Sequence, residues 1–127
     1  MMISSYGELL AAARAQSLPQ RLLFAFARAE LPAGADFDQR TRFGAGRGGA
    51  LEPVMCVDKS PADLGTFAQL VDESRHTGAH WDVVFVSSMD EPASVEAPLK
   101  RMVAAIQGGQ LGNFLAFDRD GELLKFH

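Results

Sequence analysis

One stretch of alternating residues limits the folds open to this chain more than any other feature. Two sets of apolar side chains alternate over residues 21–29: Leu22, Phe24 and Phe26 on one face, and Leu23, Ala25 and Ala27 on the other. A period of two predicts a β-strand, and apolar residues on both faces predict that both faces are covered. The small side chains of the second face favour a closely packed helix there. We therefore expect a sheet with a layer against each of its faces.

The other segments predict an α/β domain with three helices and about five strands. Helices are expected over residues 5–16, 60–78 and 97–109, because their apolar residues recur with helical spacing. Further strands are expected over residues 54–57, 81–86, 113–117 and 122–126. An Asp-Gly turn joins the last two strands, which predicts a C-terminal β-hairpin. The expected order is α-β-β-α-β-α-β-β, in one domain over residues 1–127.

A βαβ unit is expected in the middle of this order. Strand 54–57, the helix after it and strand 81–86 predict two parallel strands with a right-handed crossover, inside a single mixed sheet. The order of the strands in the sheet is not readable from the sequence. The helix has a strong start signal, with Ser60 as the N-cap and Pro61 at the first helical position.

Composition restricts the classes of function. The chain is 47% hydrophobic and 22% charged, which is typical of a globular domain. It has no apolar run of the roughly 18 residues that a membrane span needs, and no basic residue precedes the short apolar stretch near the N-terminus. We therefore expect a cytoplasmic protein. A net charge of −4 argues against a general nucleic-acid binder.

The charge is unevenly distributed along the sequence. Residues 1–50 contain six Arg and four acidic residues, whereas residues 51–127 contain six basic and twelve acidic residues. The irregular segment 32–50 is predicted to be a loop, in which Arg40, Arg42 and Arg47 form a candidate contact for a partner or an anion. A solvated loop face is the simpler interpretation of these arginines.

Several motifs do not fit the context that their chemistry requires. Gly44–Gly49 matches G-x-G-x-x-G, but no strand precedes it and no helix follows it, so a loop is favoured over a dinucleotide site. His76 and His80 have the i, i+4 spacing of metal ligands, but Gly78 is expected to end the helix between them. Asp118–Glu122 fits a turn better than a calcium loop. No metal and no cofactor are therefore predicted.

The single cysteine, Cys56, lies in an apolar strand. A thiol in this setting usually behaves as a small buried hydrophobic residue rather than as a nucleophile. Because it is alone, it cannot form a disulfide within the chain.

One candidate ligand site follows from the predicted topology. Ligands of open α/β sheets bind beyond the carboxyl ends of parallel strands. If strands 54–57 and 81–86 are neighbours, six polar residues gather at such an edge: Asp58, Lys59, Ser60, Ser87, Ser88 and Asp90. The free amides of the helix that begins at Ser60 would favour an anion there. The alternative is that these residues are ordinary strand-end polar groups and a helix cap.

Four segments together resemble a known group of proteins. They are QRLLF (20–24), GGALEPVMCVDK (48–59), WDVVFV (81–86) and APLKRMV (97–103). Nearly the whole chain resembles small, uncharacterised proteobacterial proteins that are often labelled "ribonucleotide reductase subunit alpha". A catalytic subunit of that enzyme is several times larger and uses a radical cysteine with a reducing cysteine pair, whereas Cys56 is the only thiol here. We therefore predict that this chain is not such a subunit.

These observations favour a non-catalytic bacterial binding module for a partner protein or a small anionic ligand. The main reason is that no catalytic triad, metal cluster, phosphate loop or carboxylate pair fits its context. The alternative is a small enzyme that acts on an anionic metabolite through Asp58, Lys59 and Ser88. An accessory role in nucleotide metabolism has only the group's label in its favour.

Overall fold

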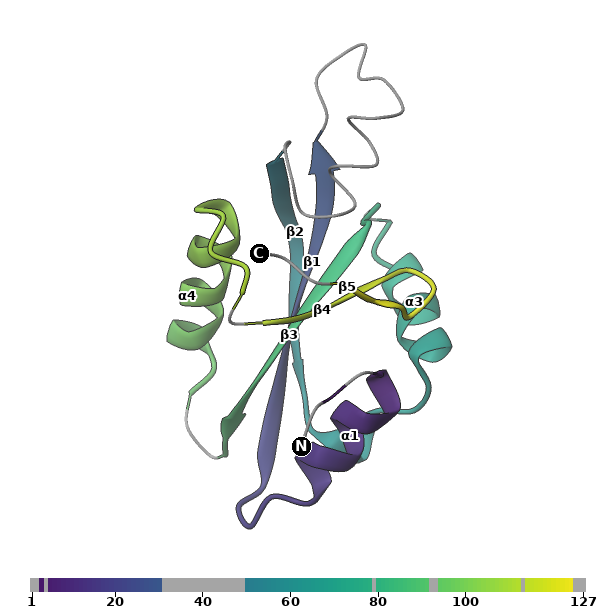
Figure 1. Cartoon of the computed structure of the whole chain (residues 1–127), viewed down its shortest axis with the longest axis vertical. Helices are drawn as coiled ribbons and strands as arrows, with labels where there is room; N and C mark the ends of the chain where they lie inside the picture. Colours follow the sequence, from purple (N-terminus) through teal and green to yellow (C-terminus); the bar gives the residue numbers. More distant parts are fainter. Residues whose placement is uncertain are drawn as a thin grey trace.

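The computed structural model describes residues 3, 5–30, 50–78, 80–91, 94–112 and 114–124. A five-stranded sheet forms its centre (Figure 1). The strands are β1 (Gln20–Glu30), β2 (Ala50–Lys59), β3 (Val83–Asp90), β4 (Leu115–Asp118) and β5 (Leu123–Leu124). They lie in the order β2-β1-β3-β4-β5, and all four pairings are antiparallel.

Helices cover both faces of the sheet, as the alternation in β1 predicts. The helices are α1 (Tyr6–Arg14), α3 (Phe67–Arg75) and α4 (Glu96–Gln107), with a short 3-10 helix η1 at Pro61–Asp63. In Figure 1, α4 lies on one side of the sheet, and α1 and α3 lie on the other. We call these two sides the α4 face and the α3 face. The predicted three helices and five strands, and their order along the chain, are confirmed.

Each face has its own hydrophobic core. On the α3 face, the fully buried side chains of Phe24 and Phe26 pack with those of α1 and α3. On the α4 face, Ala25 packs with Met102 and Ile106 of α4, so the small residues of β1 do admit a close helix. Burial of each Phe side chain stabilises the fold by about 1.5–3 kcal/mol. β1 contributes fully buried residues to both cores.

The expected mixed sheet is wrong, because all four pairings are antiparallel, and the adjacency of β2 and β3 on which the candidate ligand site depended does not hold. β2 and β3 run in the same direction, but β1 lies between them and pairs with both. Leu23 of β1 faces Asp58 on one side and Ser87 on the other. The physical reason is that β1, which is apolar on both faces, takes a central position and hydrogen-bonds along both of its edges.

The predicted helix start at Ser60 is also wrong. Residues after Ser60 form only the 3-10 turn η1, and α3 begins six residues later behind its N-cap Thr66. Thr66 and Gln69 form a complete capping box, which provides a stronger start. Gly65 makes room for it, because a Cβ at this position would lie 1.7 Å from Oε1 of Gln69.

Other local predictions hold. The helix expected over residues 5–16 is α1, and Ser5 at the start of that range is its N-cap, accepting a hydrogen bond from the Glu8 amide at 3.1 Å. β4 and β5 form the expected hairpin, whose turn contains Gly121 at a φ of 85°.

Arg40, Arg42 and Arg47 of the predicted loop lie outside the described residues. Among the described helices, none has the length and apolar character required to cross a membrane.

Candidate functional site

The predicted polar cluster lies at one end of the sheet, where β1 begins and β2 and β3 end. Across β1, Leu22 is opposite both Lys59 and Ser88, and Gln20 is opposite Asp90. Because neighbouring residues of a strand point to opposite faces, the sheet divides this cluster in two. The predicted residues share an end of the molecule but do not share a face.

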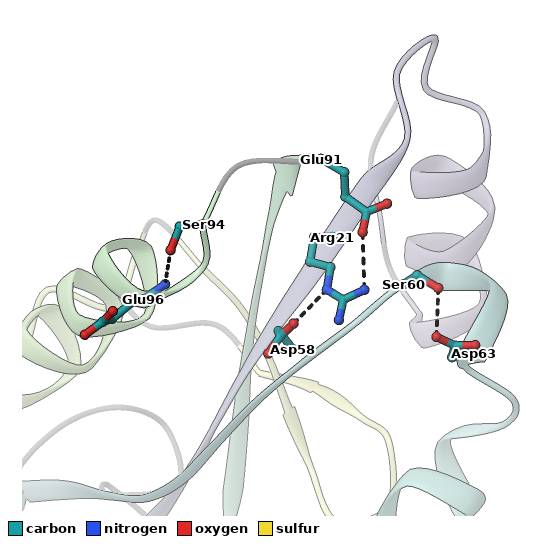
Figure 2. Close-up of polar contacts among 7 residues, drawn as sticks. All are labelled: Arg21, Asp58, Ser60, Asp63, Glu91, Ser94 and Glu96. Atoms are coloured by element: carbon teal, nitrogen blue, oxygen red, sulfur yellow. Dashed lines mark hydrogen bonds and ion pairs between the residues drawn. The ribbon is translucent and has the colours of Figure 1, made fainter.

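On the α4 face, Asp58 binds an arginine that the sequence did not single out. Nε of Arg21 lies 2.7 Å from Oδ2 of Asp58, and Nη1 lies 3.2 Å from Oε1 of Glu91 (Figure 2). The hydrogen bond to Asp58 is the main reason that the pKa of Arg21 is raised. Asp58 and Glu91 are therefore neutralised in part by one guanidinium that ties the ends of β2 and β3 to β1.

On the α3 face, Lys59 and Asp90 each bind a different neighbouring residue. Nζ of Lys59 lies 2.5 Å from Oε2 of Glu73 in α3. Nε2 of Gln20 donates to Oδ1 of Asp90 at 2.6 Å. Both interactions tie strand ends to their neighbours.

The remaining predicted residues are dispersed. Ser60, which precedes η1, donates to Oδ2 of Asp63 at 3.0 Å (Figure 2). Ser88 is exposed on the α3 face, while Ser87 is half-buried on the α4 face. Asp58, Lys59 and Ser88, the residues of the enzyme alternative, therefore do not converge on one point.

A cleft on the α4 face contains part of the predicted cluster. We call it the α4-side cleft. It has a volume of about 660 Å³ and lies between the end of β3, the first turns of α4 and Phe114. Its apolar lining comes from Leu23, Met89, Met102 and Phe114, and its polar side chains are those of Ser87, Ser94 and Arg101. Apolar walls with a few polar groups are typical of small-molecule sites.

Arg101 is the charged group of this cleft. Among the described lysines and arginines, it is the one without an ion pair, a hydrogen bond or an aromatic contact. The others have partners: Arg14 with two carbonyls, Arg21 with Asp58 and Glu91, Arg28 with Glu52, Lys59 with Glu73, Arg75 with Asp72, Lys100 with Glu96, and Arg119 with Trp81. An unpaired guanidinium beside an apolar cleft is a binding group for an anion.

The sequence contained little signal for this site. Arg101 precedes the buried Met102 in α4, as a solvent-facing residue of an amphipathic helix normally does. Its lack of a partner depends on where every acidic side chain lies in three dimensions. Position on the helix alone does not reveal it.

The other candidates of the sequence have structural roles. Cys56 is partly rather than fully buried, lies opposite Ala25 on the α4 face, and has a pKa raised by burial. His76 is the C-cap of α3, and Gly78 follows with a φ of 76°. His80 contacts Asp82 at 3.3 Å. Within the described ranges, no three His, Cys, Asp or Glu side chains are grouped as metal ligands.

No protein-family model, no curated protein and no solved structure matched the chain.

Proposed function

We propose that this chain is a non-catalytic binding module of the bacterial cytoplasm that holds a small organic anion in the α4-side cleft. The observation that carries this proposal is the guanidinium of Arg101, which has no partner among the described residues and lines an apolar cleft of about 660 Å³. That volume lies within the range of about 300–1,000 Å³ of small-molecule sites.

The lining indicates which anion the cleft would bind. The planar guanidinium of Arg101 can donate two parallel hydrogen bonds to a carboxylate or a phosphate. The side chains of Met89, Met102 and Phe114 would contact an apolar body attached to that group. The hydroxyls of Ser87 and Ser94 are further donors at the same cleft. We therefore expect an amphipathic anion rather than an inorganic one.

Binding is favoured over catalysis because charged residues at this end of the sheet form ion pairs with neighbouring side chains. Asp58 is bonded to Arg21 and Lys59 to Glu73, on opposite faces of the sheet. A general base or nucleophile needs a reacting partner within hydrogen-bond reach of the same bound atom. The α4-side cleft offers a cation and hydroxyls for holding a ligand but pairs none of them with an activating group among the described residues.

The test is a comparison of three probes by ¹H–¹⁵N shift mapping. Octanoate has both the charge and the apolar body, octan-1-ol has the body alone, and inorganic phosphate has the charge alone. We expect octanoate to shift the amides of Ser87, Met102 and Phe114 at lower concentrations than either of the other probes. The proposal is wrong if octanoate leaves these amides unmoved, or if its shifts lie elsewhere on the molecule.

A further inference from the structure

The outer edge of β2 has no partner strand among the described residues. β2 is the first strand in the order β2-β1-β3-β4-β5 and spans ten residues, Ala50–Lys59. A bulge at Val54 interrupts its pairing with β1 and divides β2 into two regularly paired stretches, residues 50–53 and residues 55–59. The backbone N–H and C=O groups along an edge of this kind are free to pair with another strand.

Two apolar grooves lie along β2, one on each face of the sheet. On the α4 face, Cys56 and the α4 residues Leu99 and Val103 line a groove of about 380 Å³. On the α3 face, Met55 and Val57 line a smaller groove of about 130 Å³. The β2 side chains that border these grooves are only partly buried.

These features define the strand that would fit there. A strand added beside β2 would direct alternate side chains toward the two faces, so its apolar residues would extend both grooves. A suitable strand must therefore be apolar on both faces. β2 itself is such a strand, because Val54–Val57 places apolar side chains on each face.

We infer that β2 pairs antiparallel with β2 of a second copy of this chain, about a two-fold axis near Cys56. The inference is independent of the anion proposed for the α4-side cleft. A two-fold axis perpendicular to the sheet keeps each residue on its own face. A residue of one copy therefore lies opposite either the same residue of the second copy or one that is an even number of positions away. Centring at Cys56 sets Met55 against Val57 of the second copy and brings both Cys56 residues together.

The neighbouring registers are less favourable. Centring at Met55 sets Cys56 of each copy against the bulged Val54 of the other, and a bulge disrupts the regular pairing of two strands. Centring at Val57 sets Met55 against a charged Lys59. One strand pair buries less than the roughly 1,000 Å² of a stable interface, so we expect self-association that depends on concentration.

Cys56 makes the register testable because it is the only cysteine. Directly opposed residues of antiparallel strands have Cα atoms about 4.5–5.5 Å apart, a separation that a disulfide can span. Diamide would remove one hydrogen from each thiol and join the two sulfurs. Since burial raises the pKa of Cys56, the oxidation is run at about pH 9, where more thiolate forms.

The experiment combines sedimentation equilibrium with this oxidation. We expect the wild-type chain to dimerise at high concentration, Cys56→Ser to dimerise equally well, and Cys56→Asp to weaken the dimer about tenfold or more by opposing two carboxylates. Circular dichroism is used to check that Cys56→Asp is folded. We also expect diamide to link the folded chain faster than the urea-unfolded chain at equal concentration. A monomer at every concentration, an unweakened Cys56→Asp dimer, or equal linking of folded and unfolded chains would overturn the inference.

Discussion

The guanidinium of Arg21 in β1 lies 2.7 Å from the carboxylate of Asp58 in the neighbouring strand β2. The same guanidinium lies 3.2 Å from Glu91, just beyond the end of β3. Arg21 therefore occupies the position between β2 and β3 where the sequence predicted an open ligand site. Asp58 has a structural partner, and Arg101, on the same face, remains without one among the described residues.

Removal of Arg21 should loosen this end of the sheet. Arg21→Met leaves two partly buried carboxylates, Asp58 and Glu91, without their cation. We expect a lower urea midpoint for Arg21→Met than for the wild type. Lys100→Met is the matched control, since Lys100 and Glu96 are both 77% exposed and their pair contributes little. Equal midpoints for the two variants would contradict this structural role.

Ser74 links Trp81 to α3. Nε1 of Trp81 donates to Oγ of Ser74 at 2.8 Å, and Oγ donates to the carbonyl of Val71 at 2.6 Å. Ser74→Ala leaves the buried indole N–H without an acceptor, and we expect a loss of about 1–3 kcal/mol in the free energy of unfolding. Urea unfolding followed by the fluorescence of Trp81, the single tryptophan, measures it. Ser88→Ala, at an exposed position, should change stability by less than about 0.5 kcal/mol.

Tyr6 predicts a stability change at high pH. Its hydroxyl is buried without a hydrogen-bond partner among the described residues, and burial raises its pKa from 10.0 to about 12. The folded state thus favours the neutral phenol, so this contribution is complete below pH 10 and is lost as the pH rises toward 12. Tyrosinate absorbance follows Tyr6 alone, because the chain has one tyrosine. Between pH 10 and pH 12, we expect the free energy of unfolding to fall less for Tyr6→Phe than for the wild type, because the variant has no phenol to ionise. An absorbance midpoint near 10 would show that the hydroxyl is solvated.

Two glycines should respond oppositely to the same substitution. Gly121 has a φ of 85°, and a Cβ there would lie 3.2 Å from Cδ2 of Phe67. Gly121→Ala should therefore destabilise the hairpin turn, by about 1 kcal/mol or more. Gly7 lies in α1, where a Cβ would approach Oγ of Ser5 only to 3.9 Å. Gly7→Ala should stabilise by about 0.5–1 kcal/mol. Thermal unfolding of both variants checks the signs, and equal signs would contradict this account.

The features that were predictable from the sequence are local. The Ser5 cap, the two faces of β1 and the Gly121 turn each depend on residues close together in the chain. The Ser60 start signal was local as well, but the capping box at Thr66 lies close behind it and is the start that α3 uses. Competition between two start signals was not resolved by reading either of them alone.

The strand order and the binding site depend on distant residues. Pairing of β1 with β3 joins Leu23 to Ser87, and no short-range pattern distinguishes this arrangement from pairing of β2 with β3. Because β1 lies between β2 and β3, Arg21 of β1 binds Asp58 of β2, and this carboxylate does not line an open ligand site. Arg101 is notable only once every other described cation has a partner, which is a property of the whole fold.

Calorimetric titration with octanoate tests the proposed function most directly. The wild-type chain is compared with Arg101→Gln, which removes the charge in the α4-side cleft, and with Arg75→Gln, which removes the charge of an exposed arginine in α3. We expect Arg101→Gln to weaken octanoate binding about tenfold or more, and Arg75→Gln to leave it unchanged. Equal affinities for the wild type and Arg101→Gln would contradict the account.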